Sequence, residues 1–165
     1  MSKGYSGLFN GTQGLPVPGS IDLMRKGDDF IINMRKSHDI DTNGRLDIIA
    51  HGGPHTVKYQ INGMDMKLNH RDLAALIKAR GGYKGKIIRL LSCETGADPN
   101  GFAQNLANKL NMVVEAPNKL LWAEPSGIYY VASRDKIRPK YPNMSDKGEF
   151  VMFYPGGNKN GRKKM

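Results

Sequence analysis

Three apolar runs separated by helical patterns constrain the fold of this chain more than any other feature. The runs are RLDIIAH (45–51), KIIRLLS (86–92) and MVVEAP (112–117). Nearly continuous apolar runs are typical of strands buried on both faces, whereas a strand with one wet face alternates apolar and polar residues. Strands that alternate with helices predict an α/β fold, with a mostly parallel sheet flanked by helices.

Helix signals fill the intervals between the three runs. Asn69 can cap a helix that Gly81 can end, and its apolar stripe is expected to face the sheet. Asp98, with Pro99 in the first helical position, is expected to open a second helix. The apolar residues of this second helix follow a helical spacing: Phe102, Ala103, Leu106, Ala107 and Leu110.

Turn signals predict two β-hairpins added to the sheet. Asn62-Gly63 lies between two short alternating runs within 57–68, and Pro125-Ser126-Gly127 joins LLWAE to IYYVAS. Two further strands are expected at DDFIINM (28–34) and EFVMFYP (149–155).

The chain length of 165 residues suits one domain with a sizeable core. Residues 1–20 are Gly-rich and are interpreted as a flexible lead-in or linker, 21–156 as a single catalytic α/β domain, and 157–165 as a basic disordered tail. The net charge is +10, and the last 32 residues carry nine basic and three acidic side chains. A basic tail makes nucleic acid a candidate partner alongside a solvated end.

Several classes of protein are excluded or not indicated. No apolar stretch is long enough to span a membrane, and the N-terminus lacks the apolar core of a secretory signal. A single cysteine rules out an internal disulfide and a cysteine-rich zinc site. The sequence therefore indicates no metal and no cofactor.

Two of the apolar runs end in residues that can carry chemistry. The first runs into His51 and then Gly52-Gly53-Pro54, and the second runs into Cys93, the only cysteine. Because the working crevice of a parallel sheet lies beyond the carboxyl ends of its strands, neighbouring strands would bring His51 and Cys93 together there.

A cysteine and a histidine at one edge suit nucleophilic catalysis. The imidazole favours the thiolate and later protonates the leaving amine, and such pairing lowers a thiol pKa from about 8.5 into the range of roughly 3.5 to 7.5. Glycines beside the histidine let the backbone approach a substrate. The alternative is structural, because a lone cysteine is commonly an inert core residue and a histidine can simply end a strand.

An apolar strand into His-Gly, followed some 40 residues later by an apolar strand into Ser-Cys, resembles the caspase-like superfamily of cysteine peptidases. The resemblance covers about residues 45–117. It implies a caspase-like fold, a protein or peptide substrate, His51 as general acid/base and Cys93 as nucleophile. It also implies an oxyanion hole formed by the backbone N–H groups of Gly52 and Cys93.

The chain departs from this family in two places. The region before the histidine strand is short and Gly-rich, and Glu94-Thr95-Gly96 follows the cysteine where caspases have Arg-Gly, so a caspase preference for Asp does not carry over. Residues 90–122 also resemble C-terminal effector regions of bacterial polymorphic toxins, such as Rhs and contact-dependent inhibition proteins. That resemblance implies a cognate immunity protein and a delivered effector acting in a target-cell cytoplasm; otherwise the protein is expected to be cytoplasmic.

Two other functions remain open at this point. One is a basic toxin ribonuclease that uses His51 and His55 for acid–base cleavage. The other is a non-catalytic binding module in which His51 and Cys93 are structural. Trp122 is expected near the crevice, either as core packing or as a wall of a substrate pocket. His38 and His70 are interpreted as surface residues.

Overall fold

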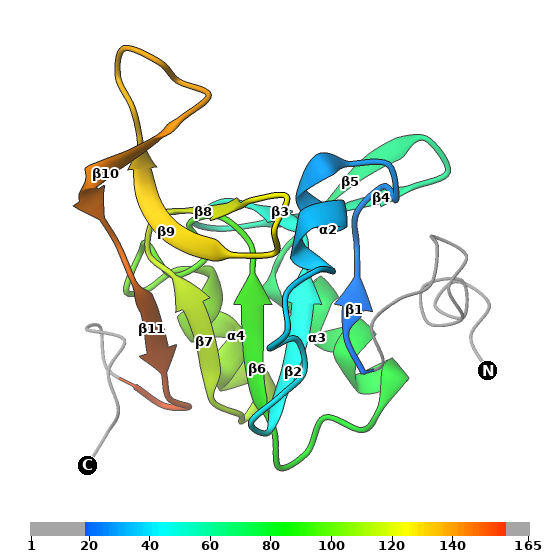
Figure 1. The fold of residues 1–165 in the computed structure, drawn as a ribbon. Helices are drawn as coiled ribbons and strands as arrows, with labels where there is room; N and C mark the ends of the chain where they lie inside the picture. The colour runs from blue at the N-terminus through cyan, green and yellow to red at the C-terminus, as the bar shows by residue number, and fades with distance from the viewer. Residues whose placement is uncertain (1–18, 158–165) are drawn as a thin grey trace.

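The computed structural model describes residues 19–157 and confirms an α/β fold with a mostly parallel central sheet (Figure 1). Four neighbouring strands are parallel, and a fifth closes the sheet antiparallel to the fourth. In spatial order they are β1 (Ile21–Asp22), β2 (Arg45–Ile49), β6 (Ile87–Leu91), β7 (Val114–Pro117) and β11 (Phe150–Phe153). Of the lead-in 1–20 and the tail 157–165 expected from the sequence, all but residues 19, 20 and 157 lie outside the described part.

Two helices, α3 (His70–Arg80) and α4 (Phe102–Leu110), cover one face of the sheet (Figure 1). Asn69 caps α3 in a capping box with Asp72, as the sequence predicts, and Gly81 ends it. The predicted start of α4 is wrong, because its N-cap is Gly101. The Asp98 carboxylate instead accepts the N–H of Asn100, so residues 98–101 form a turn before the helix.

The other face of the sheet carries a second apolar cluster under α2 (Asp29–Met34) and two strands of the later hairpin. The strand expected at 28–34 is wrong, since these residues form this short helix. Asp28 caps it by accepting the N–H of Phe30, and Ile31 and Met34 are buried one turn apart while Ile32 is exposed. The burial spacing is that of a helix rather than of a strand.

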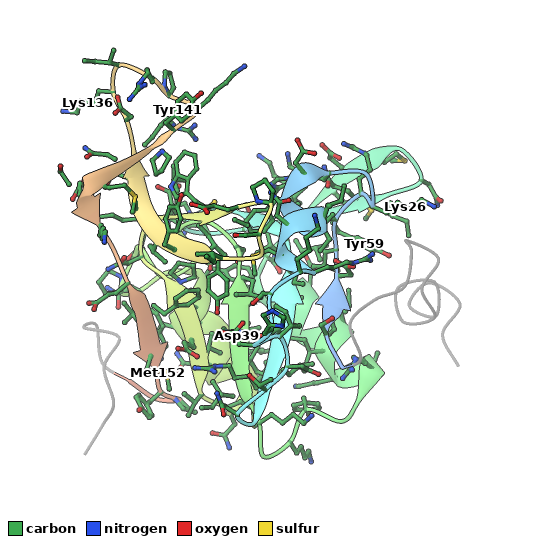
Figure 2. All side chains as sticks on the ribbon, in the orientation of Figure 1. Lys26, Asp39, Tyr59, Lys136, Tyr141 and Met152 are labelled. Atoms are coloured by element: carbon green, nitrogen blue, oxygen red, sulfur yellow. The ribbon has the colours of Figure 1, made fainter. Side chains whose placement is uncertain are left out.

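Both predicted hairpins are confirmed, and each belongs to a small antiparallel sheet beyond the central one. The first sheet contains β3 (His51–Gly52), β4 (Val57–Ile61) and β5 (Met64–Leu68). Asn62 and Gly63 join β4 to β5 with φ angles of 53° and 74°, which suits a type I′ turn. The second contains β8 (Leu120–Ala123), β9 (Tyr129–Arg134) and β10 (Pro142–Lys147). The loop between β9 and β10, which carries Lys136 and Tyr141, stands away from the body (Figure 2).

A buried ion pair lies within the central sheet, on the face opposite α3 and α4. Arg89 of β6 and Asp47 of β2 are register partners and form a bidentate pair with N···O distances of 2.6 and 3.0 Å. Arg89 also donates to the hydroxyl of Tyr129 and to the Asp39 carboxylate, and Tyr129 donates to Asp39. These contacts tie the sheet to the 35–44 connection and to β9.

Candidate functional site

The ends of β2 and β6 bring His51 and Cys93 to one edge of the sheet. Ile49 and Leu91 are register partners in this parallel pair, and the N–H of Ala50 donates to the Leu91 carbonyl at 3.2 Å. His51 and Cys93 each lie two residues beyond these partners. The matched strand ends predicted from the sequence are therefore present.

Gly52 lies directly against the segment that contains Cys93. A Cβ atom at position 52 would come within 2.9 Å of Thr95 Cγ2, 3.1 Å of Ser92 Cβ and 3.2 Å of the Cys93 carbonyl oxygen. Distances this short leave no room for a side chain. The glycine after His51 thus permits the close approach of the two strand ends, whereas a Cβ at Gly53 would meet nothing within 4 Å.

An aspartate orients the His51 ring. His51 Nε2 lies 2.8 Å from Asp28 Oδ2, and the other Asp28 oxygen accepts the N–H of Phe30 as the cap of α2. A carboxylate accepts hydrogen bonds, so this contact suits the ring tautomer in which Nε2 donates to Asp28 and Nδ1 can accept a proton. The His51 side chain is 40% exposed. Sequence reasoning missed Asp28 because only the tertiary fold brings it to a residue 23 positions away.

Cys93 is half-buried and contacts the backbone of β8. Its Sγ accepts the N–H of Leu121 at 3.3 Å, and its S–H donates to the Leu121 carbonyl at 3.7 Å. Burial raises the pKa of the Cys93 thiol, the Leu121 N–H lowers it, and the charges of Glu94 and Arg134 act in opposite directions. The net pKa is raised. This direction is opposite to the lowered thiol pKa expected from the sequence, because the burial of the thiol outweighs the hydrogen bond from the Leu121 N–H.

The turn that follows Cys93 is held tightly. Glu94 has a φ of 61°, a left-handed conformation that costs free energy in a residue other than glycine. Its N–H donates to the Lys119 carbonyl, and the N–H of Gly96 donates to the Pro117 carbonyl. Ser92 and Thr95 share a buried hydroxyl–hydroxyl contact of 3.1 Å across the same turn. The backbone of Cys93 is therefore fixed from both sides.

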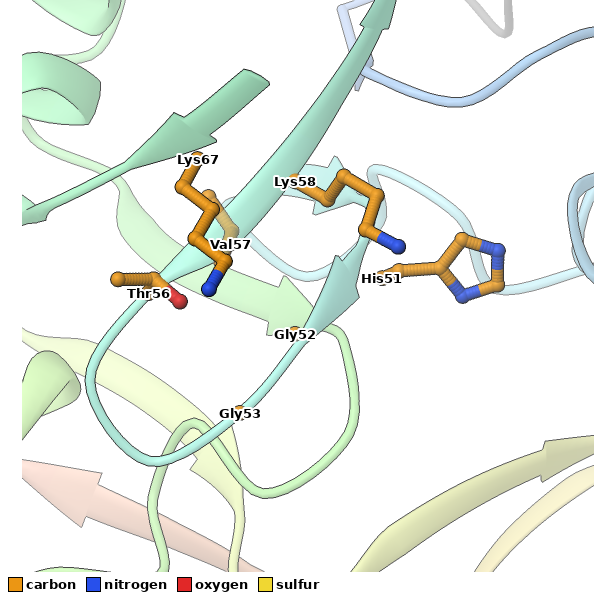
Figure 3. A pocket seen from close by; sticks show the side chains of 7 residues that line it. All are labelled: His51, Gly52, Gly53, Thr56, Val57, Lys58 and Lys67. Atoms are coloured by element: carbon orange, nitrogen blue, oxygen red, sulfur yellow. The ribbon is translucent and has the colours of Figure 1, made fainter. Parts of the chain in front are cut away.

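A pocket of about 210 Å³ adjoins His51 on the side of the β4–β5 hairpin (Figure 3). It is lined by His51, Gly52, Gly53, Thr56, Val57, Lys58 and Lys67. Nothing in the spacing of either lysine predicts a functional role from the sequence. In Figure 3 the Lys58 side chain extends toward the His51 ring, and the Lys67 side chain extends toward Thr56 and Gly52.

The other residues singled out in the sequence lie elsewhere. Trp122 does not line this pocket; its Nε1–H donates to the Ala132 carbonyl at 3.0 Å, and the Arg134 guanidinium lies 6.0 Å from its ring centre. His55 is largely exposed and pairs with Asp98 at 3.4 Å. His38 is exposed as expected. His70 is half-buried instead of lying on the surface; burial lowers the pKa of its ring, and the positive charges of Arg71 and Lys109 lower it further.

Within residues 19–157, no group of three or more His, Cys, Asp or Glu side chains is arranged to hold a metal ion. No helix in this part of the chain is long and apolar enough to cross a membrane.

Comparison with known proteins identifies one family. Residues 19–131 match the family model described as Domain of unknown function (DUF8616). This span includes the central parallel strands, the β4–β5 hairpin and both His51 and Cys93. No curated protein matches the chain.

Proposed function

We propose that this chain, which belongs to the DUF8616 family, is a caspase-like cysteine peptidase with His51 as general acid/base and Cys93 as nucleophile. The observation that carries the proposal is the matched register of β2 and β6. It delivers an imidazole and a thiol to equivalent positions beyond one sheet edge, with Gly52 packed against the cysteine segment. The Asp28 carboxylate adds the orienting group that a His-dependent nucleophile requires.

The first chemical step in this proposal forms an acyl-enzyme. The Cys93 proton passes to His51 Nδ1, Sγ attacks the substrate carbonyl carbon, and the carbonyl π electrons move onto oxygen. The N–H groups of Gly52 and Cys93 stabilise this oxyanion. The C–N bond then breaks as the imidazolium gives its proton to the leaving amine, which leaves a thioester on Cys93.

The second step hydrolyses the thioester. His51 takes a proton from water, the water oxygen bonds to the carbonyl carbon, and the C–S bond breaks. The thiolate recovers its proton from His51, so enzyme and protons balance over the cycle. The Asp28 carboxylate holds the Nε2–H in both steps and stabilises each imidazolium.

Because the pKa of Cys93 is raised, the thiol is neutral in this mechanism before the substrate binds. Proton transfer to His51 then accompanies substrate attack, instead of preceding it as in a preformed thiolate–imidazolium pair. A substrate strand that displaces the Leu121 contact would free Sγ for this step.

The biological setting proposed is that of an effector domain of a bacterial toxin, delivered to a target-cell cytoplasm and restrained by a cognate immunity protein. This part rests on the resemblance of residues 90–122 to polymorphic-toxin effector regions.

One observation favours a second candidate, the ribonuclease. Lys58 and Lys67 beside His51 give an acid–base residue with two cations, which phosphate chemistry also uses. The predicted partner His55 does not support it, because His55 pairs with Asp98 and does not line the pocket of His51. This candidate also leaves the position of Cys93 without a role.

The test is to express wild type, Cys93→Ala, His51→Ala and His55→Ala in a bacterial host, and to assay the purified proteins on unfolded protein and on RNA. The peptidase predicts that Cys93→Ala and His51→Ala each lose several orders of magnitude in proteolysis, with little additivity. His55→Ala is the matched histidine control and should retain activity. RNA cleavage that survives Cys93→Ala would replace the peptidase with the ribonuclease.

A further inference from the structure

We propose that the pocket beside His51 binds a carboxylate of the substrate through Lys58 and Lys67, so that the enzyme cleaves peptides next to an acidic residue. This inference rests on the proposed function, because it takes the ligand to be a side chain of a polypeptide. The β4–β5 hairpin would then select the substrate, a role that the caspase resemblance does not give to Lys58 or Lys67.

The three key side chains form one row across the small sheet. His51 of β3 is the register partner of Lys58 of β4, and Lys58 is in turn the partner of Lys67 of β5. Residues directly opposite one another in antiparallel strands project from the same face. The row places the Lys58 ammonium toward the imidazole and the Lys67 ammonium toward Thr56 in the same pocket, as Figure 3 shows.

Two lysines at directly opposed positions repel each other unless an anion lies between them. The nearest acidic partner is Asp65, 3.6 Å from Lys58 Nζ, but this carboxylate also pairs with Arg25 at 3.2 Å and accepts a hydrogen bond from Gln60. Among residues 19–157, Lys67 forms no ion pair. Positive charge is thus in excess at this face of the hairpin.

The rest of the lining suits a single anionic side chain. Thr56 contributes a hydroxyl, Gly52 and Gly53 contribute backbone without side chains, and no carboxylate lines the pocket. The volume of about 210 Å³ is smaller than sites for drug-sized ligands, which occupy roughly 300 to 1,000 Å³. An Asp or Glu side chain therefore suits the pocket better than a nucleotide does.

The first experiment measures cleavage of peptide libraries that carry Asp, Glu, Asn, Gln or Lys at each position around the cleaved bond. We expect acidic peptides to exceed their amide counterparts in kcat/KM by about tenfold or more, and less so at high salt. Lys58→Gln combined with Lys67→Gln should abolish this preference. Lys78→Gln combined with Lys84→Gln removes the same charge from exposed sites away from the pocket and should preserve it.

Cleavage without an acidic preference, or a preference that survives Lys58→Gln/Lys67→Gln, would overturn the inference and leave the peptidase intact. Absence of any cleavage would overturn the peptidase instead.

A second experiment tests the pocket without turnover. The backbone amide signals of Gly52 and Gly53 are followed by NMR during titration with N-acetyl-aspartate amide, its asparagine analogue and inorganic phosphate. The inference predicts saturable shifts with the aspartate probe, none with the asparagine probe, and their loss in Lys58→Gln/Lys67→Gln. Equal responses to both amides, or a response to phosphate alone, would contradict it, and the latter would favour a nucleic-acid ligand.

Discussion

Two polar centres lie on the same pair of strands, and they differ in how completely their charges are satisfied. The Arg89–Asp47 pair is sealed, since Arg89 is 3% exposed and Asp47 is fully buried, whereas Asp39 at the edge of its network, 43% exposed, reaches solvent. The His51 edge is open: the imidazole is 40% exposed, with one carboxylate partner. The charges of the sealed pair satisfy each other, so we interpret this pair as structural, whereas the open edge combines a part-exposed imidazole with a half-buried thiol that hydrogen-bonds to Leu121.

The electrostatics of the sealed centre support this division. Burial alone would lower the pKa of Arg89, but the hydrogen bonds and charge of Asp47 outweigh burial, and the net pKa is raised. The guanidinium therefore stays charged at any pH at which the protein folds. A fixed charge of this kind holds the sheet together and does not exchange protons.

Breaking the sealed centre should give the largest loss of stability. Arg89→Met leaves the Asp47 carboxylate buried without a counter-ion, and the free energy of unfolding should fall by about 3 to 5 kcal/mol. Arg45→Met is the matched control, because it breaks the more exposed pair with Glu115 and should cost about 1 kcal/mol or less. Urea unfolding of both variants measures the difference, and equal losses would remove the distinction between the two centres.

Removing the Asp28 carboxylate from His51 should lower activity more than stability. Asp28→Ala and Asp28→Ser both remove the carboxylate from His51 Nε2, and both should lower kcat by roughly 100-fold. Only the alanine variant also loses the cap of α2, which costs about 1 kcal/mol of stability. If serine restored both stability and kcat, Asp28 would be a cap and not a positioning residue, and the pH profile of kcat would be unchanged.

The two adjacent glycines test how closely the strand ends must approach. Gly52→Ala forces a Cβ against Ser92, Thr95 and the Cys93 carbonyl, so it should cost about 1 to 3 kcal/mol and reduce activity. Gly53→Ala adds the same atom in open space and should change stability by less than about 0.5 kcal/mol. Thermal unfolding of the pair measures both effects, and a neutral Gly52→Ala would mean that the two segments are not in contact.

The smallest effect expected is in the pH dependence of Cys93. Its raised folded-state pKa means that the stability it contributes is present below the ordinary thiol pKa of about 8.5 and is lost as pH rises through the folded value. Alkylation by iodoacetamide should accordingly accelerate only at alkaline pH in the unliganded protein. Rapid alkylation near pH 7 would show instead a preformed thiolate, as a resting Cys–His ion pair requires.

The sequence predicts most of the central architecture because the signals there are local. The apolar runs give β2, β6 and β7, and Asn69 and Asn62-Gly63 mark a helix start and a hairpin turn that the structure contains. The register of β2 with β6 follows once these strands are neighbours, so the matched positions of His51 and Cys93 could be expected.

The sequence-based predictions fail where contacts between distant segments determine the local structure. The run of Phe30, Ile31 and Ile32 has strand propensity, but capping by Asp28 and burial of Ile31 and Met34 make it a helix. β10 is polar and mostly exposed, so no hydrophobic pattern marks it. The Asp28–His51 contact and the lysine row depend on packing between segments, and no spacing in the sequence encodes them.

If His51 and Cys93 act as one site, a peptide electrophile should trap Cys93 covalently with the help of His51. The purified protein is incubated with peptidyl acyloxymethyl ketones bearing acidic, neutral or basic residues, and the adducts are located by mass spectrometry. We expect an adduct on Cys93 that requires folded protein and that forms at least about 100-fold more slowly in His51→Ala. A Cys93 that reacts with none of these probes, or that reacts equally fast without the imidazole, would contradict it.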